Sequence, residues 1–400
     1  MVIRISDKTQ NYSKVTKLLV KPKIYKNKLN SIPVFIIILF LAFLYVGNLK
    51  SATIEFDLDN PISIKEDINS TSEQIGLFEN NLKSISLDSE EYINIKNDLN
   101  LAKERKECLE NKLKAYKNRD WHQFYQNDIR LKKIDLEATN KYESDYDDEF
   151  LQTIKLNEEY SLYQYENKLG FDDRFTPVQG ISYIILIVNN YLSIILIVMM
   201  AFILSSLYCS NYFNGIDISI IVPMKQVNRI MTKLMVGCFV GISATLLVLI
   251  ISGTLGSIGT EFGSLKSPIL TYCASGICEY EPIINFMMSW IIMSILSMLF
   301  ISNVIFVLSG LLKKRTSCFF SSLLFLFACT WGCTKIAPIF SIVHLIPTTY
   351  LNCLQVLSGE IGYLTQNNNI NALTGIIVLL VCNIVLTIIN FSLMKMREVK

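Results

Sequence analysis

Six apolar runs constrain this 400-residue chain more than any other feature of its sequence. A helix needs roughly 20 mostly apolar residues to cross a bilayer, where no water is present to satisfy its backbone. Hydrophobic residues make up 51% of the chain, more than a soluble domain usually carries. The runs predict an all-α polytopic membrane protein with six transmembrane helices, at residues 32–48, 181–207, 234–255, 283–312, 317–335 and 372–393.

Basic residues mark one side of this predicted membrane. Of the 19 Lys and Arg residues outside 49–180, 17 fall in the terminal segments 1–31 and 394–400 and in the loops 208–233 and 313–316. Because loops on the cytoplasmic side are enriched in Lys and Arg, both termini are predicted to be cytoplasmic. A basic amino-terminal segment can also bind nucleic acid, but its place directly before a span favours anchoring at the membrane surface. We therefore expect a multi-pass protein of the plasma membrane without a nucleic-acid partner.

Residues 49–180 have the opposite character, with 28 acidic and 18 basic residues. The orientation of the first span places this segment outside the cell. Apolar residues recur at steps of three, four and seven over 68–85 and over 92–116, which predicts two helices in an antiparallel, coiled-coil-like hairpin. Ser89 is the expected N-cap of the second helix, which would end near Lys117. Residues 119–134 and 149–169 predict two more helices.

Aromatic side chains are dense in the second half of this extracellular segment. One interpretation is packing between the hairpin and the returning helix, and the other is a surface for an amphipathic peptide or lipid. Acidic clusters at 145–149 and 172–173 favour cationic peptides, because long-range attraction would raise their local concentration. The aromatic residues are Tyr142, Tyr146, Phe150, Tyr160, Tyr163 and Tyr165.

The cytoplasmic loop 208–233 has an unusual internal order. Asn214 and Gly215 form a turn signal, and an apolar segment then ends at Pro223, which lacks a backbone N–H. Beyond it, basic residues recur every four positions on one face of a new helix, at Lys225, Arg229 and Lys233. The loop therefore combines an apolar helix with a basic helix at the inner membrane surface.

This order between the second and third spans resembles that of ABC-2-type transporter permeases, whose loop carries the helix that couples to the ATPase. The resemblance implies a separate ABC ATPase subunit in two copies, which would bind ATP and Mg, and a second permease copy or a paralogue as dimer partner. It also implies interfacial or re-entrant helices at 336–371, as such permeases carry between their last two spans. The implied ATPase-coupling residues are Asn214, Gly215, Ile216, Asp217, Ile218, Ser219, Ile220, Ile221, Val222 and Pro223.

The sequence contains no GxxxxGK[ST] phosphate loop, no HExxH motif and no CxxC pair. We therefore expect a transport subunit that is not itself an enzyme and has no catalytic residue, no metal site and no cofactor of its own. In the loop 256–282, Cys273 and Cys278 are separated by four residues. An external position permits a disulfide, and two free thiols are the alternative.

Polar and small residues within the spans suggest contacts between helices. Gly237 and Gly241 are spaced for close helix packing. Four asparagines either form hydrogen bonds between helices or line a substrate path, and these are Asn189, Asn190, Asn303 and Asn383. Asn390 belongs to the same class.

Two functions agree with these patterns. The first is the permease subunit of an ATP-binding cassette exporter that moves a peptide-like or amphipathic substrate, such as a bacteriocin or an antimicrobial or signalling peptide. The second is a membrane-anchored sensor or interaction protein that binds a peptide or partner through the external hairpin without transport. Recovery of an ATPase with the chain would distinguish them.

Overall fold

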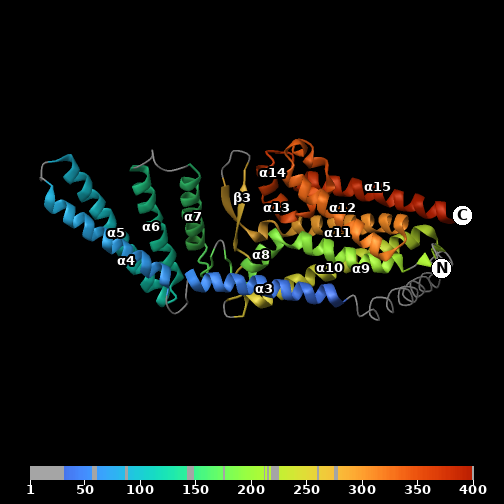
Figure 1. Ribbon diagram of the computed structural model, residues 1–400, viewed down its shortest axis with the longest axis horizontal. Coiled ribbons are helices and arrows are strands. Elements are labelled where there is room, and N and C mark those ends of the chain that lie inside the picture. The colour runs from blue at the N-terminus through green and yellow to red at the C-terminus, as the bar shows by residue number, and fades with distance from the viewer. Residues whose placement is uncertain are drawn as a thin grey trace, which may run out of the picture.

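Six helices in the described part of the chain are long and apolar enough to cross a membrane. The computed structural model describes residues 31–55, 61–85, 89–141, 148–173, 176–210, 212–213, 216–217, 225–258, 261–273 and 278–398. The chain is therefore a mostly helical multi-pass membrane protein (Figure 1). The six helices are α3 (Ser31–Glu55), α9 (Leu192–Cys209), α10 (Gln226–Gly256), α11 (Met287–Leu312), α12 (Arg315–Lys335) and α15 (Ala372–Glu398).

The second predicted span is divided in two. In place of one helix over 181–207, α8 (Gly180–Asn190) and α9 meet at Tyr191, whose backbone leaves the helical region at φ −123° and ψ −23°. Asn189 and Asn190 directly precede this break, and asparagine competes with the helix for backbone hydrogen bonds. Only α9 is long enough to be counted among the six spans. The break therefore places two polar side chains, Asn189 and Asn190, beside the start of α9.

Small residues let the helices of the bundle approach closely. Helix α11 packs against α9, α10, α12 and α15. A Cβ atom on Gly237 would lie 1.9 Å from Ser302 Oγ, and one on Gly241 would lie 2.8 Å from Met298 Cγ. Neither position admits a side chain without a shift of α10 or α11. The prediction of close packing at these two glycines is confirmed.

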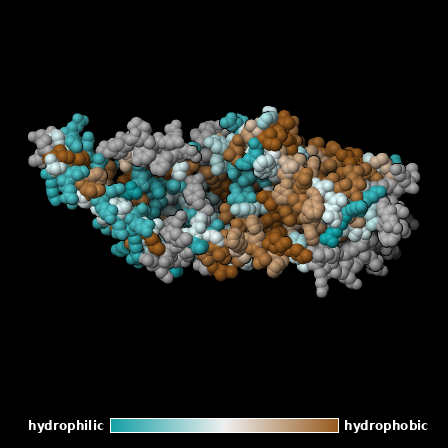
Figure 2. Space-filling view, viewed as in Figure 1, coloured by the Kyte–Doolittle hydropathy of each residue, from teal (hydrophilic) through white to brown (hydrophobic). Residues whose placement is uncertain are grey.

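A hydrophilic arm extends from one end of the bundle, as Figures 1 and 2 show. Its helices lie side by side, and each packs mainly on the next along the chain. The Ser89 side chain accepts a hydrogen bond of 3.1 Å from the Tyr92 backbone N–H, which confirms the predicted N-cap. All four helices lie where apolar spacing predicts them, and they are α4 (Ile62–Ser84), α5 (Glu90–Lys117), α6 (Trp121–Lys141) and α7 (Asp148–Glu166).

Aromatic rings form the core at the base of the arm. Tyr116, Trp121, Phe124 and Phe171 pack around one another, with ring centroids 5.2–6.1 Å apart. They come from the end of α5, the start of α6 and the chain that follows α7, so they join all three segments. This cluster fixes the arm where it approaches the bundle.

The mostly helical fold agrees with the all-α prediction, and two short antiparallel hairpins that the sequence did not predict add to it. Strands β1 (Tyr212–Phe213) and β2 (Ile216–Asp217) pair within the predicted coupling loop. Strands β3 (Pro268–Tyr272) and β4 (Cys278–Pro282) pair in the loop 256–282, with Tyr272 opposite Cys278. The second hairpin packs against α7 of the arm.

Short helices occupy the apolar segment 336–371. Pro338 and Pro347 lie in the first turns of two of these 3-10 helices, where the missing backbone N–H is tolerated. The segment lies at the arm end of the bundle (Figure 1). Its helices are η4 (Ala337–Ile339), η5 (Val343–Leu345), η6 (Pro347–Leu351), α13 (Cys353–Leu357) and α14 (Glu360–Leu364), and a further 3-10 helix, η3 (Ile283–Asn285), precedes α11.

Candidate functional site

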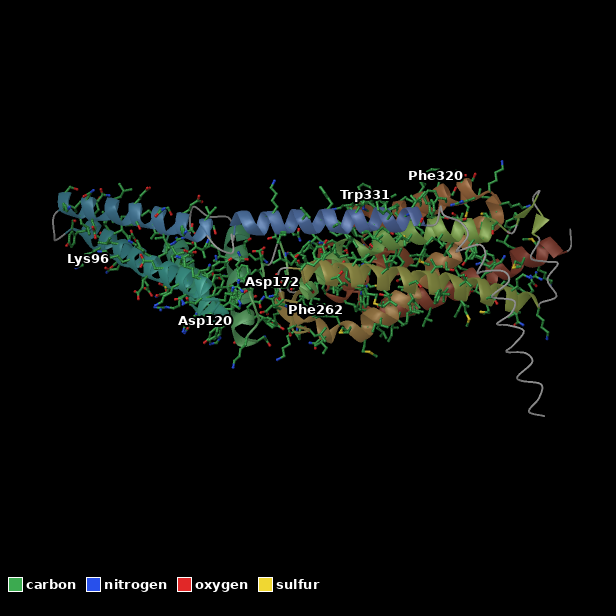
Figure 3. All side chains as sticks on the ribbon, turned by 90° about the horizontal axis from the view of Figure 1, so that it is seen from below. Lys96, Asp120, Asp172, Phe262, Phe320 and Trp331 are labelled. Carbon is green, nitrogen blue, oxygen red and sulfur yellow. The ribbon has the colours of Figure 1, made fainter. Side chains whose placement is uncertain are left out.

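A cavity of about 260 Å³ lies where the arm meets the bundle, and we call it the junction cavity. It is bounded by α7, the loop before α8, α8 itself, the β3–β4 hairpin and the turn between α13 and α14. Figure 3 places Asp172, one of its lining residues, at this junction, far from Lys96 near the tip of the arm. Segments from residue 160 to residue 360 thus converge on one site.

A glycine allows the turn before α14 to approach the hairpin. The Tyr272 backbone N–H donates a hydrogen bond of 2.7 Å to the Ser358 carbonyl. Gly359 follows with φ +79°, and a Cβ there would lie 2.3 Å from the Tyr272 carbonyl oxygen. Only glycine accommodates both the left-handed conformation and this approach. The turn places Glu360 at the start of α14, where it lines the junction cavity.

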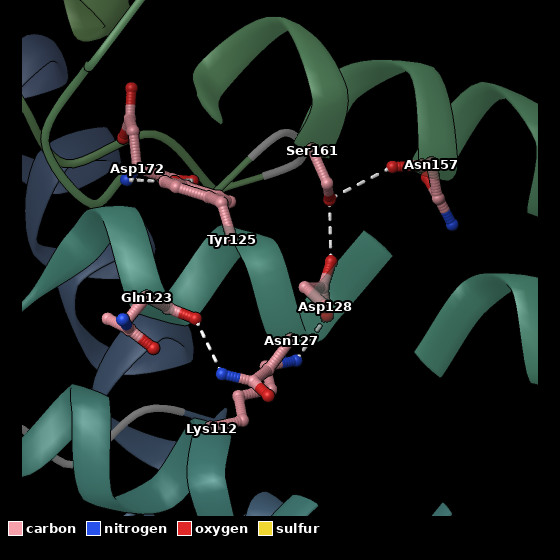
Figure 4. Close-up of polar contacts among 8 residues, drawn as sticks. All are labelled: Lys112, Gln123, Tyr125, Asn127, Asp128, Asn157, Ser161 and Asp172. Atoms are coloured by element: carbon pink, nitrogen blue, oxygen red, sulfur yellow. Dashed lines mark hydrogen bonds and ion pairs between the residues drawn. The ribbon is translucent and has the colours of Figure 1, made fainter. Parts of the chain in front are cut away.

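Asp172 is a buried carboxylate that connects the arm to the start of α8. One carboxylate oxygen, Oδ1, accepts hydrogen bonds from the backbone N–H groups of Asp173 and Val178, at 3.1 and 3.3 Å. The Tyr125 hydroxyl accepts a bond of 3.2 Å from the Asp172 N–H (Figure 4). Burial raises the pKa of Asp172 to about 7, against the opposing effect of hydrogen bonds from Ser182 and Val178. The carboxyl therefore changes charge near neutral pH.

Glu360 supplies a second, half-buried carboxylate from another wall of the junction cavity. Its Oε2 atom accepts a hydrogen bond of 3.2 Å from Asn189 Nδ2, which joins α14 to α8. Burial raises the pKa of the Glu360 carboxyl, and the bond from Asn189 opposes this rise. An incoming cation would favour the ionised form of this group.

Tyrosine rings form the third part of the lining. Tyr160 of α7 and Tyr280 of β4 contact edge to face, with centroids 5.5 Å apart, and Tyr272 of β3 stacks obliquely on Tyr363 at 5.3 Å. Tyr160, Tyr272 and Tyr280 line the junction cavity. Since their rings are held by neighbours, they present fixed aromatic surfaces.

A second cavity of about 180 Å³ lies within the arm, and we call it the arm cavity. Lys112 pairs there with Asp128, whose other oxygen accepts a hydrogen bond of 2.5 Å from Ser161 (Figure 4). Burial alone would raise the pKa of Asp128, but the Lys112 charge prevails and holds it below its ordinary value. Asp172 and Tyr160 also line this cavity, so the two cavities share a wall.

The predicted coupling residues fall mainly outside the described part of the chain. Ile216 and Asp217 form strand β2. The remaining ones lie outside the described residues, and their role stays a prediction: Asn214, Gly215, Ile218, Ser219, Ile220, Ile221, Val222 and Pro223.

The asparagines predicted for a substrate path separate into two groups. Asn303 of α11 donates a hydrogen bond of 3.0 Å to Asn383 of α15, and Asn390 donates one of 3.1 Å to Asn303. All three are buried, so they hold α11 against α15 in this conformation. Asn189 and Asn190 instead line the junction cavity. The path interpretation therefore stays open for this second pair.

The cysteine prediction is not decided by the structure. Cys273 is exposed and lies next to the end of β3. The side chain of Cys278 lies outside the described part, so a disulfide between them stays a prediction.

The aromatic residues of the second half of the arm mainly pack, where they are described. Tyr165 stacks on His122 with centroids 4.2 Å apart, and Tyr163 approaches Tyr280 at 6.4 Å. Tyr160 packs and also lines both cavities. Tyr142 and Tyr146, and the side chain of Phe150, lie outside the described part.

Sequence reasoning did not single out Glu360, Tyr272 or Tyr280. One signal for Glu360 was available, because it is the single acidic residue in the apolar segment 336–371. For the two tyrosines we find no such signal, since only the β3–β4 pairing brings them together. No family model, curated protein or solved structure matches this chain.

Proposed function

We propose that this chain is the permease subunit of an exporter for peptide-like, amphipathic substrates, driven by a separate ATPase. The junction cavity carries the proposal. It is a hollow with several polar lining groups at the end of a six-helix bundle, bounded by a break between α8 and α9 and by the base of a hydrophilic arm. Polar groups at such a break are typical of substrate sites in transport proteins, where irregular backbone lines a cavity.

The distribution of basic residues supports an outward-facing arm. Figure 1 shows the start of α10 and the end of α15 at the bundle end opposite the arm. Lys225 and Arg229 lie at that end of α10, Lys314 lies between α11 and α12, and Arg315 begins α12. Lys and Arg on one side of a multi-pass protein favour the cytoplasm for that side. On this orientation the hairpin β1–β2 and residues 214–223 would meet a cytoplasmic ATPase.

An assembly experiment tests this proposal. The affinity-tagged chain is expressed with the ATPase encoded nearest to it, and the ATPase recovered per permease is measured for wild type and Ile220→Asp. We expect at least about a tenfold loss of ATPase, because a charge would have to be buried in an apolar contact. Ile220→Val keeps the apolar side chain, and Thr316→Asp adds the same charge at an exposed position in the first turn of α12. Both controls should retain the ATPase, and equal recovery with Ile220→Asp would refute the coupling role.

The arm cavity favours a second candidate, a sensor or interaction protein. This cavity lies mainly among α5, α6 and α7 of the arm, so a ligand could bind there without passing through the bundle. If no ATPase is recovered with the wild-type chain, this second function becomes the better account.

A further inference from the structure

We propose that the junction cavity binds a primary ammonium group, supplied by a lysine side chain or a free amino terminus of a peptide. The proposal deepens the proposed function, because it names the substrate chemistry of the same site. It rests on that function in one respect, because the peptide that carries the ammonium group is assumed to be the transported substrate.

The size of the cavity limits what can enter. Sites for drug-sized molecules usually have volumes of roughly 300–1,000 Å³. At about 260 Å³, the junction cavity lies just below this range. It suits one extended side chain or one chain terminus, and a helix or hairpin of a peptide would have to remain outside.

The charge of the lining determines the sign of the ligand. Asp172, Asp173 and Glu360 contribute three carboxyl groups, and no Lys, Arg or His of the described chain lines the cavity. Asp172 is buried and the other two are half-buried, so bringing an anion beside their ionised forms would add repulsion to the cost of its desolvation. A cation instead gains charge-assisted hydrogen bonds, which are shorter and stronger than neutral ones.

The spread of these carboxyl groups favours an organic cation over a metal ion. A bound divalent ion needs several oxygen ligands at about 2.0–2.6 Å from one point. Among the described residues, no group of three His, Cys, Asp or Glu side chains is placed to hold a metal. Asp172 and Glu360 also come from different walls of the cavity. An ammonium group on a flexible stem can reach such separated acceptors one at a time.

Aromatic and amide groups complete the match. Tyr160, Tyr272 and Tyr280 give the cavity ring faces and edges, and an ammonium group is attracted to the face of an aromatic ring. The same rings can cover the methylene stem of a lysine, which is apolar. Asn189 and Asn190 supply amide oxygens beside Glu360 and accept hydrogen bonds from the three N–H donors of an ammonium group.

A binding measurement on the purified full-length chain in nanodiscs tests the proposal. The probes are N-acetyl-lysine amide, norleucine amide with a free amino terminus, and N-acetyl-norleucine amide, which has a similar shape without charge. We expect the first, the second or both to bind at least about tenfold more tightly than the third, since a charged hydrogen bond contributes that much or more. The two charged probes distinguish a side chain from a chain terminus as the source of the ammonium group.

Variants locate the binding in the junction cavity. Glu360→Gln removes a charge and retains an acceptor oxygen for Asn189, and it should weaken binding of the charged probe about tenfold or more. Glu166→Gln removes an equal charge from an exposed position on α7 and should change binding less than about twofold. Tyr272→Leu, which keeps the backbone bond to Ser358, should weaken binding about threefold or more.

Three results would overturn the proposal. They are equal affinity for all three probes, equal loss in Glu360→Gln and Glu166→Gln, and displacement of the charged probe by millimolar calcium. The comparison of probes on wild-type protein remains decisive even where a variant fails to fold. The binding assay contains no ATPase, so its outcome is independent of the assembly experiment. If the charged probe binds but no ATPase is recovered with the chain, only the exporter proposal is refuted. If the ATPase is recovered but the charged probe does not bind, only this inference is refuted.

Discussion

The bundle and the arm are built from helices of similar length, but different contacts hold them together. In the bundle, side-chain hydrogen bonds join residues that are far apart in the chain. For example, the Tyr183 hydroxyl donates a hydrogen bond of 2.7 Å to the Leu41 carbonyl. In the arm, each helix packs mainly on its neighbour along the chain. The comparison shows that the bundle depends on a few tight long-range contacts, whereas the arm depends on local packing and on charge pairs.

The charge pairs of the arm differ greatly in burial. Lys112 and Asp128 are nearly enclosed, and the Lys112 ammonium group also lies 4.9 Å from the Phe124 ring centroid. Lys103 and Glu79 form a pair of 2.8 Å between α5 and α4, but about half of each side chain is exposed to solvent. We therefore expect the Lys112–Asp128 pair to be important for the stability of the arm and the Lys103–Glu79 pair to contribute little to it.

The largest effect should come from filling the contact between α10 and α11. Gly237→Ile would place side-chain atoms where Ser302 now lies, because even a Cβ would come within 1.9 Å of its hydroxyl. Overpacking usually costs about 1–3 kcal/mol, and contact this close should exceed that range. We expect little folded protein, measured as the monodisperse fraction after detergent extraction.

Gly76→Ala is the matched change in the arm. A Cβ on Gly76 of α4 would have nothing within 4 Å, and alanine is the better helix former by about 1 kcal/mol. Folded yield should therefore stay at the wild-type level or rise. Normal yield of Gly237→Ile would show that the bundle does not depend on this long-range contact.

The next effect should be confined to the arm. Lys112→Met leaves Asp128 buried without its cation, and removing one partner of a buried ion pair costs about 3–5 kcal/mol. Hydrogen exchange of backbone amides should become faster in α5, α6 and α7 and stay unchanged in α10 and α11. Lys103→Met, at the exposed pair, should leave the exchange rates of the arm close to those of the wild type, because solvent screens such a pair. Faster exchange throughout the bundle would contradict the separation of the two regions.

The parts of the fold that were predictable are those determined by neighbours along the chain. Hydropathy located the six spans, and apolar spacing with Ser89 as N-cap located α5. The break at Tyr191 was missed because its surroundings are uniformly apolar except for two asparagines. A hydropathy average does not register an interruption of one residue.

The junction cavity was not predictable for a different reason. Asp172 could be noted as an acidic residue, but its burial depends on Val178, Ser182 and Tyr125 lying around it. Glu360 joins it only because Gly359 brings the turn before α14 against β3. Pairing between such distant segments leaves no periodic signal in the sequence, so the site emerges only from the assembled fold.

Transport of a cationic peptide tests the central claim most directly. Inverted membrane vesicles that contain the chain and its ATPase are given a fluorescent, lysine-rich amphipathic peptide, and its ATP-dependent accumulation is measured. The account predicts accumulation with wild type and with Glu166→Gln, and at least about a tenfold loss with Glu360→Gln, because the cavity then loses one of the three carboxyl groups that bind the ammonium group. Accumulation that is the same with and without ATP, or that is undiminished in Glu360→Gln, would contradict it.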